Sequence, residues 1–134
     1  MDYVFNEHNV VLNPSIIFEY EPVNALVWMK FQLKVGRCVN GLWDFGYWIP
    51  GGCSPVCFGR YETKQECKEI AIDFLKDYFK SYVDKGYNYK KYFIEAKTEF
   101  NRFLNRELLK QESQTSHLIH IADNGTNYTQ GYLF

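Results

Sequence analysis

The dipeptide Asn40-Gly41 most constrains the fold, because it lies between two runs in which apolar and polar residues alternate. Alternation with a period of two is typical of β-strands that bury one face, and Asn-Gly favours the tight turn of a β-hairpin. The sequence therefore predicts a central antiparallel hairpin over residues 25–49. The face that should meet the core holds Phe31, Leu33, Val35, Phe45, Tyr47 and Ile49.

The length of the loop decides which side chains share a face. A two-residue loop pairs Val39 with Leu42 and puts the two apolar sets on opposite faces. A three-residue loop, with its glycine in the left-handed conformation, pairs Cys38 with Leu42 and sets Val35 opposite Phe45. Because a shift of one residue turns every side chain to the other face, burial of a common apolar face favours the three-residue loop, or an equivalent bulge at Gly36 or Gly46.

The same register gives the second face of the hairpin a mixed aromatic and basic character. Its members are Trp28, Lys30, Gln32, Lys34, Asp44 and Trp48. Two tryptophans among lysines have two explanations: the terminal segments half cover this face, or the face is a contact surface. For the second explanation we expect the binding residues to be Trp28, Lys30, Lys34 and Trp48.

Two helices are predicted after the hairpin. Thr63 and Glu66 have the spacing of a capping box, which predicts a helix over about 63–84 with Gly86 after its end. Its apolar stripe holds Cys67, Ile70, Ala71, Phe74, Leu75, Tyr78 and Tyr82. A second helix is predicted over about 88–112, and its stripe could pack on the first helix or on another copy of the chain.

Shorter strands are predicted around these elements. Residues 16–20 alternate between two proline breaks, which favours a short edge strand. Residues 50–55 form a turn rich in Gly and Pro, and 56–58 could make another short strand. A strand at 117–121, a turn at 123–125 and a return strand at 127–134 predict a C-terminal β-hairpin. Together these elements predict one α+β domain over residues 1–134.

Composition limits the classes of function. Fifteen basic and sixteen acidic residues give a net charge of −1, so no overall charge attracts nucleic acid or a membrane surface. The longest apolar runs are far shorter than the roughly 20 residues that span a bilayer, which excludes a membrane span. The N-terminus lacks the pattern of a secretion signal, so we expect a cytoplasmic protein whose four cysteines are reduced.

No motif indicates a catalytic site, a metal site or a cofactor. Three residues separate Cys53 from Cys57, rather than the two that typically separate the ligands of a zinc knuckle, and no second pair follows. His117 and His120 would lie on opposite faces of the predicted strand and could not easily bind the same metal ion. An enzyme that uses these histidines or cysteines is therefore the third hypothesis, after two kinds of binding protein.

The segment 85–92 interleaves lysines with tyrosines. Its residues Lys85, Tyr87, Lys90 and Lys91 have the chemistry that holds single-stranded nucleic acid, in which cations meet the phosphates and aromatic rings stack on the bases. The alternative is a loop between helices whose tyrosines pack inward. Nucleic acid binding is the second hypothesis.

The layout of hairpin, Gly-Pro turn and Tyr-x-Thr-x-x-Glu helix start resembles small αβ modules of phage and plasmid proteins over about residues 28–82. The resemblance implies an origin in a phage or mobile element and assigns no functional residue. The leading hypothesis is a small non-enzymatic binding module that uses its aromatic and basic surface to contact a protein partner, either another protein or a second copy in a homodimer.

Overall fold

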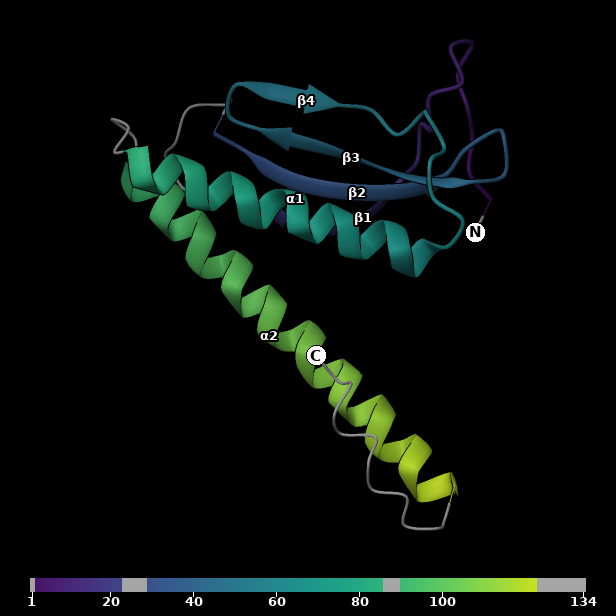
Figure 1. Cartoon of the computed structure of the whole chain (residues 1–134). Helices are drawn as coiled ribbons and strands as arrows, with labels where there is room; N and C mark the ends of the chain where they lie inside the picture. Colours follow the sequence, from purple (N-terminus) through teal and green to yellow (C-terminus); the bar gives the residue numbers. More distant parts are fainter. Residues whose placement is uncertain (1, 23–28, 86–89, 123–134) are drawn as a thin grey trace. The chain divides into compact units, whose positions relative to one another are not determined.

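The computed structural model describes residues 2–22, 29–85 and 90–122, with helix side chains up to Ser81 and from Lys91 to Lys110. A four-stranded antiparallel sheet has the order β1-β2-β3-β4, and α1 lies along one face of it (Figure 1). This confirms the predicted α+β class. The strands are β1 (Ser15–Tyr20), β2 (Phe31–Arg37), β3 (Trp43–Ile49) and β4 (Gly52–Ser54), and the helices are α1 (Lys64–Lys85) and α2 (Lys90–Ala122).

The central hairpin has the predicted three-residue loop. The backbone N–H of Cys38 donates to the carbonyl of Leu42 over 2.8 Å, and Gly41 has a φ of +84°. Val35 pairs with Phe45 in the register of β2 and β3. Both side chains are buried, so the burial argument selected the correct loop.

An aromatic cluster fills the space between the sheet and the helices. The ring of Phe31 lies 5.3 Å from that of Phe79 on α1 and 5.6 Å from that of Phe93 at the start of α2, measured between centroids. Tyr47 lies 4.4 Å from Phe74. The apolar face of the hairpin therefore meets the helices as predicted. Phe79, which the predicted stripe omitted, is almost fully buried, whereas Phe74 is only half-buried.

The first helix begins where the capping signal predicts. The backbone N–H of Glu66 donates to the hydroxyl of Thr63 over 3.1 Å, which satisfies one of the N–H groups that a helix leaves unpaired at its start. The backbone N–H of Cys67 donates to the carbonyl of Thr63, and this is the first hydrogen bond of the helical i to i−4 pattern. Tyr78 later donates from its buried hydroxyl to the carbonyl of Pro50, which ties α1 to the turn after β3.

The second helix is longer than predicted and corrects the C-terminal prediction. It continues through residues 117–121, where a strand was expected. No glycine or proline occurs between Lys90 and Ala122, so nothing in the backbone ends the helix at the polar residues 111–116. The predicted C-terminal hairpin is not confirmed, and its turn and return strand lie outside the described residues.

The chain turns back after β3 and begins its next strand sooner than predicted. β4 forms at Gly52–Ser54 and pairs with the end of β3, rather than at residues 56–58. Gly51 has a φ of +92°, a conformation that L-residues rarely adopt, and this allows Gly52 to pair directly with Ile49. The turn therefore needs only residues 50 and 51.

One end of the sheet face opposite α1 is covered by other parts of the chain. Val11, Cys38 and Val56 form a small buried cluster, and the backbone N–H of Val11 donates to the carbonyl of Val56. Two glycines of the sheet, Gly36 and Gly46, allow these segments to approach it closely. A Cβ on Gly36 would meet Val11 and Val56 at 3.2 Å, and one on Gly46 would lie 2.5 Å from the carbonyl oxygen of Ser54.

The chain divides into two compact units. Residues 1–97 hold the sheet, α1 and the start of α2, and residues 98–134 form the second unit. Within the second unit the rings of Phe100 and Phe103 stack with a centroid separation of 5.8 Å. None of the described helical stretches is both long and apolar enough to cross a membrane.

Candidate binding surface

Three of the predicted binding residues lie together on the sheet face opposite α1, which we call the outer face. Gln32 pairs with Trp48, and Lys34 pairs with Ile16 on one side and Gly46 on the other. Paired residues in an antiparallel sheet point to the same side, and so do residues two apart on one strand. The solvent-accessible part of the outer face consists of four exposed residues, Ile16, Glu19, Trp48 and Cys53, and three half-buried ones, Lys30, Gln32 and Lys34.

The charges of the outer face are only partly balanced. Glu19 forms an ion pair with Lys30, with 3.5 Å between Oε2 and Nζ. It also accepts a hydrogen bond from the side-chain amide of Gln32. Lys34 forms no ion pair with any residue that the structure describes. Its aliphatic chain lies over Gly46, where the missing side chain leaves room for it. Lys34 therefore contributes an uncompensated positive charge near the middle of the sheet.

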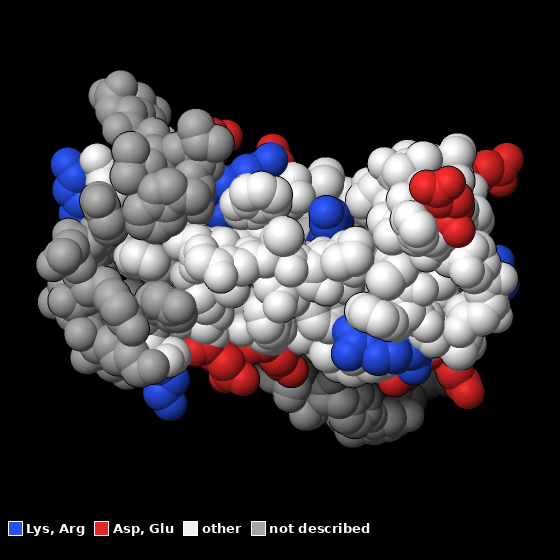
Figure 2. Space-filling model, turned by 90° about the horizontal axis from the view of Figure 1, so that it is seen from above, with Lys and Arg blue, Asp and Glu red and all other residues white. Residues whose placement is uncertain are grey.

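Trp48 gives the outer face an exposed aromatic side chain on a rigid strand. It keeps 38% of its surface accessible, although β3 pairs with a neighbour on each side at this position. Ile16 on β1 is 50% accessible. Figure 2 looks down on the molecule from above Figure 1 and shows uncharged residues across the middle of the view, with charged side chains around them. The outer face thus combines the apolar side chains of Ile16 and Trp48 with polar and charged ones.

The structure does not bring the other predicted binding residues to this face. Trp28 and Tyr87 lie outside the described residues. Lys85 ends α1 and Lys90 begins α2, and their side chains are not described. Lys91 is exposed, and its ammonium lies 5.0 Å from the ring centroid of the neighbouring Tyr92.

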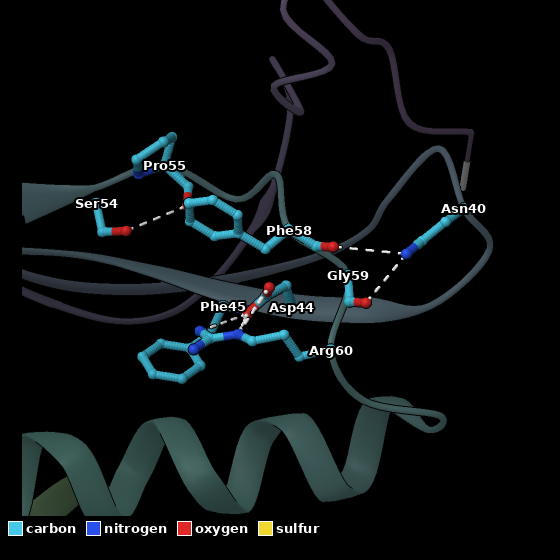
Figure 3. Close-up of polar contacts among 8 residues, drawn as sticks. All are labelled: Asn40, Asp44, Phe45, Ser54, Pro55, Phe58, Gly59 and Arg60. Atoms are coloured by element: carbon cyan, nitrogen blue, oxygen red, sulfur yellow. Dashed lines mark hydrogen bonds and ion pairs between the residues drawn. The ribbon is translucent and has the colours of Figure 1, made fainter.

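Asp44 has the register of the second face of the hairpin, as predicted, and there it is completely buried and binds Arg60 (Figure 3). The guanidinium donates from Nε to both carboxylate oxygens, at 3.2 and 3.1 Å, and from Nη2 to one of them at 2.9 Å. These bonds raise the pKa of Arg60. Phe45, Phe58 and Tyr61 surround the guanidinium with centroids 5.4–5.9 Å away.

The loop of the central hairpin is fastened to the chain after β4 by one side chain. The amide of Asn40 donates to the carbonyl oxygens of Gly59 at 3.1 Å and Phe58 at 3.5 Å (Figure 3). Its oxygen accepts from the backbone N–H of Leu42 at 3.0 Å. The sequence identified Asn40 as a turn residue, and only the structure shows this second role.

The four cysteines are free thiols in different surroundings. Cys38 and Cys67 are buried, Cys57 is half-buried and Cys53 is exposed. Burial raises the pKa of Cys67 to about 12 and also raises the pKa values of Cys38 and Cys57. Across the described residues, no group of three or more His, Cys, Asp and Glu side chains is arranged to hold a metal ion.

No protein-family model, no curated protein and no solved structure matches this chain.

Proposed function

We propose that the protein is a small non-enzymatic binding module whose outer face contacts an acidic, partly apolar surface of another protein. The observation that carries this proposal is Trp48, a large aromatic side chain held exposed in the middle of a sheet. Tryptophan is among the residues that contribute most to binding energy at protein interfaces. Its position on a paired strand means that little conformational entropy is lost on binding.

The charges of the outer face favour a protein over nucleic acid. Glu19 neutralises Lys30 and would repel a phosphate backbone, so only Lys34 offers a positive charge without a described counter-ion. One lysine beside an exposed tryptophan suits a single carboxylate next to an apolar group. A strand of phosphates requires several cations along its path. We further propose that the protein acts in the cytoplasm, where the exposed thiol of Cys53 would stay reduced.

Photo-crosslinking from the centre of the surface tests this proposal. A benzophenone amino acid replaces Trp48 in one variant and Ile94, an exposed residue of α2, in a matched control. After irradiation in a lysate of the source cells, we expect one protein to be captured from position 48 and not from position 94. The same protein, once purified, should bind Lys34→Gln more weakly than the wild type, with a smaller dependence on salt.

Other outcomes would contradict the proposal. Equal capture from both positions would indicate a non-specific surface. A crosslinked product of two copies of the chain would identify a homodimer instead, and light scattering of the free protein would check it. Crosslinked oligonucleotide, together with binding that falls steeply with salt, would favour the nucleic acid hypothesis.

A further inference from the structure

The dipeptide Asn40-Gly41 has a chemical property besides its turn preference. Because glycine has no Cβ, its backbone nitrogen can approach the side-chain amide of the preceding asparagine with little hindrance. We propose that Asn40 is a latent deamidation site that the folded loop holds in an unreactive arrangement, so that the residue converts to aspartate or isoaspartate only after the loop opens.

The reaction needs only water and a weak base. The backbone nitrogen of Gly41 loses its proton and attacks Cγ of Asn40, which forms a C–N bond and closes a five-membered succinimide. The bond from Cγ to Nδ2 then breaks, and the nitrogen leaves as ammonia with a proton from solvent. Water opens the ring at either carbonyl, which gives aspartate or isoaspartate. Each step balances without an oxidant or a cofactor.

The folded loop engages every group that the first step needs. The N–H of Gly41, which must lose its proton, donates to the carbonyl of Cys38 over 2.9 Å. The side-chain oxygen of Asn40 accepts from Leu42, and its nitrogen donates to the carbonyls of Phe58 and Gly59. The attack requires the amide of Asn40 to rotate toward its own backbone, so these hydrogen bonds must break first.

Close packing against Gly59 also restricts this rotation. Gly59 is buried and has a φ of +67°. A Cβ at this position would lie 2.2 Å from Oδ1 of Asn40 and 2.6 Å from its Nδ2. The amide therefore occupies the space that any other residue at position 59 would fill (Figure 3).

Conversion would prevent the loop from returning to its place. Aspartate at position 40 has no N–H to donate and would set a negative charge against the carbonyl oxygens of Phe58 and Gly59. Isoaspartate would also add a methylene group to the backbone of a loop whose length sets the register of β2 and β3. The modification would thus mark molecules that had once opened.

Peptide mass spectrometry can follow this residue without interference. Trypsin cleaves after Arg37 and Arg60, and Asn40 is the sole asparagine of the peptide 38–60. The wild-type protein is incubated at mildly alkaline pH, folded or in guanidinium chloride, and the peptide is analysed over time. We expect deamidation of Asn40 to be about tenfold or more slower in the folded protein, because the reaction must wait for local opening. Equal rates in the two conditions would overturn the proposal.

Two further comparisons separate protection by the loop from other effects. The peptide 111–134 contains Asn124-Gly125, an identical dipeptide, which in guanidinium chloride should react at a rate close to that of Asn40. Gly59→Ala should displace the Asn40 amide and raise its rate in the native buffer, whereas Gly52→Ala, which meets nothing within 4 Å, should not. If Gly59→Ala folds, as judged by circular dichroism, and keeps the wild-type rate, the proposed protection is wrong.

Discussion

Arg60 donates from two guanidinium nitrogens to the fully buried carboxylate of Asp44, and this pair lies beside the part of β3 that β4 does not reach. β4 pairs only with the last three residues of β3. Near the start of β3, Tyr61 pairs with this edge in place of β4 and exchanges two backbone hydrogen bonds with Trp43. The ion pair therefore holds a non-strand segment against an edge that would otherwise be unpaired.

Removal of the arginine should destabilise the protein markedly. Arg60→Gln leaves the carboxylate of Asp44 buried with only the N–H of Phe45 as a described partner. A buried acceptor without its partner costs about 1–3 kcal/mol, and more if it is charged. Because the Arg60 side chain is 52% exposed, water can partly replace it, and we expect a loss of about 2 kcal/mol in the free energy of unfolding. Urea denaturation measures this change.

Arg60→Lys and a surface pair provide the controls. Lysine keeps the charge but cannot donate in the planar, two-nitrogen arrangement, so it should recover only part of the loss. Arg102→Gln breaks an exposed ion pair with Glu99 within one helix and should cost at most about 0.5 kcal/mol. If Arg60→Gln costs no more than Arg102→Gln, the pair with Asp44 does not hold this edge.

A methyl group at Gly46 should also be costly. Its Cβ would lie 2.5 Å from the carbonyl oxygen of Ser54 and 3.0 Å from the backbone of Pro55, neither of which is a flexible side chain. We expect Gly46→Ala to lower the free energy of unfolding by about 1–3 kcal/mol, the usual cost of overpacking. Gly52→Ala meets nothing within 4 Å and should change it by less than about 0.5 kcal/mol. Thermal melts of the two variants should therefore differ clearly.

The parts of the fold that depend on local patterns could be predicted from sequence. The register of Val35 with Phe45 followed from the requirement to bury one apolar face, and the start of α1 followed from the cap at Thr63. The placement of Lys30, Lys34 and Trp48 on one face followed from the same register. In each case the deciding residues lie within one element or one hairpin.

The parts that depend on distant contacts could not be predicted in this way. Asp44 was predicted on the second face of the hairpin, which was expected to be either half covered or a contact surface, and its burial depends on Arg60, sixteen residues later in the chain. The sequence did contain a signal for this ion pair: Asp44 lies within a strand of aromatic residues, and Arg60 lies between Phe58 and Tyr61. The predicted strand at 117–121 failed for another reason, because a run of five residues has too little length to distinguish a strand from the continuation of a helix.

Two phenylalanines at opposite extremes of burial should respond very differently to truncation. Phe79 is 1% exposed and stacks on Phe31, so Phe79→Ala should lower the free energy of unfolding by about 3–5 kcal/mol. Phe58 is 63% exposed, and Phe58→Ala should cost less than about 0.5 kcal/mol apart from its contact with Arg60. Urea melts compare the two. A small effect of Phe79→Ala would contradict the position of the aromatic cluster at the centre of the core.

The buried thiol of Cys67 should make the protein less stable in alkaline solution. Burial raises its pKa from the ordinary 9.0 to about 12, so between these values the unfolded chain releases the proton while the folded chain keeps it. Since the folded state then binds more protons, stability falls as the pH rises from about 9 to about 12, by up to about 1.4 kcal/mol per pH unit. Guanidinium denaturation at a series of pH values measures this slope.

Cys67→Ala should reduce the slope, even if it lowers stability at every pH, whereas substitution of the exposed Cys53 by alanine should leave it unchanged. Equal slopes in the wild type and in Cys67→Ala would show that the thiolate is tolerated at this position in the fold.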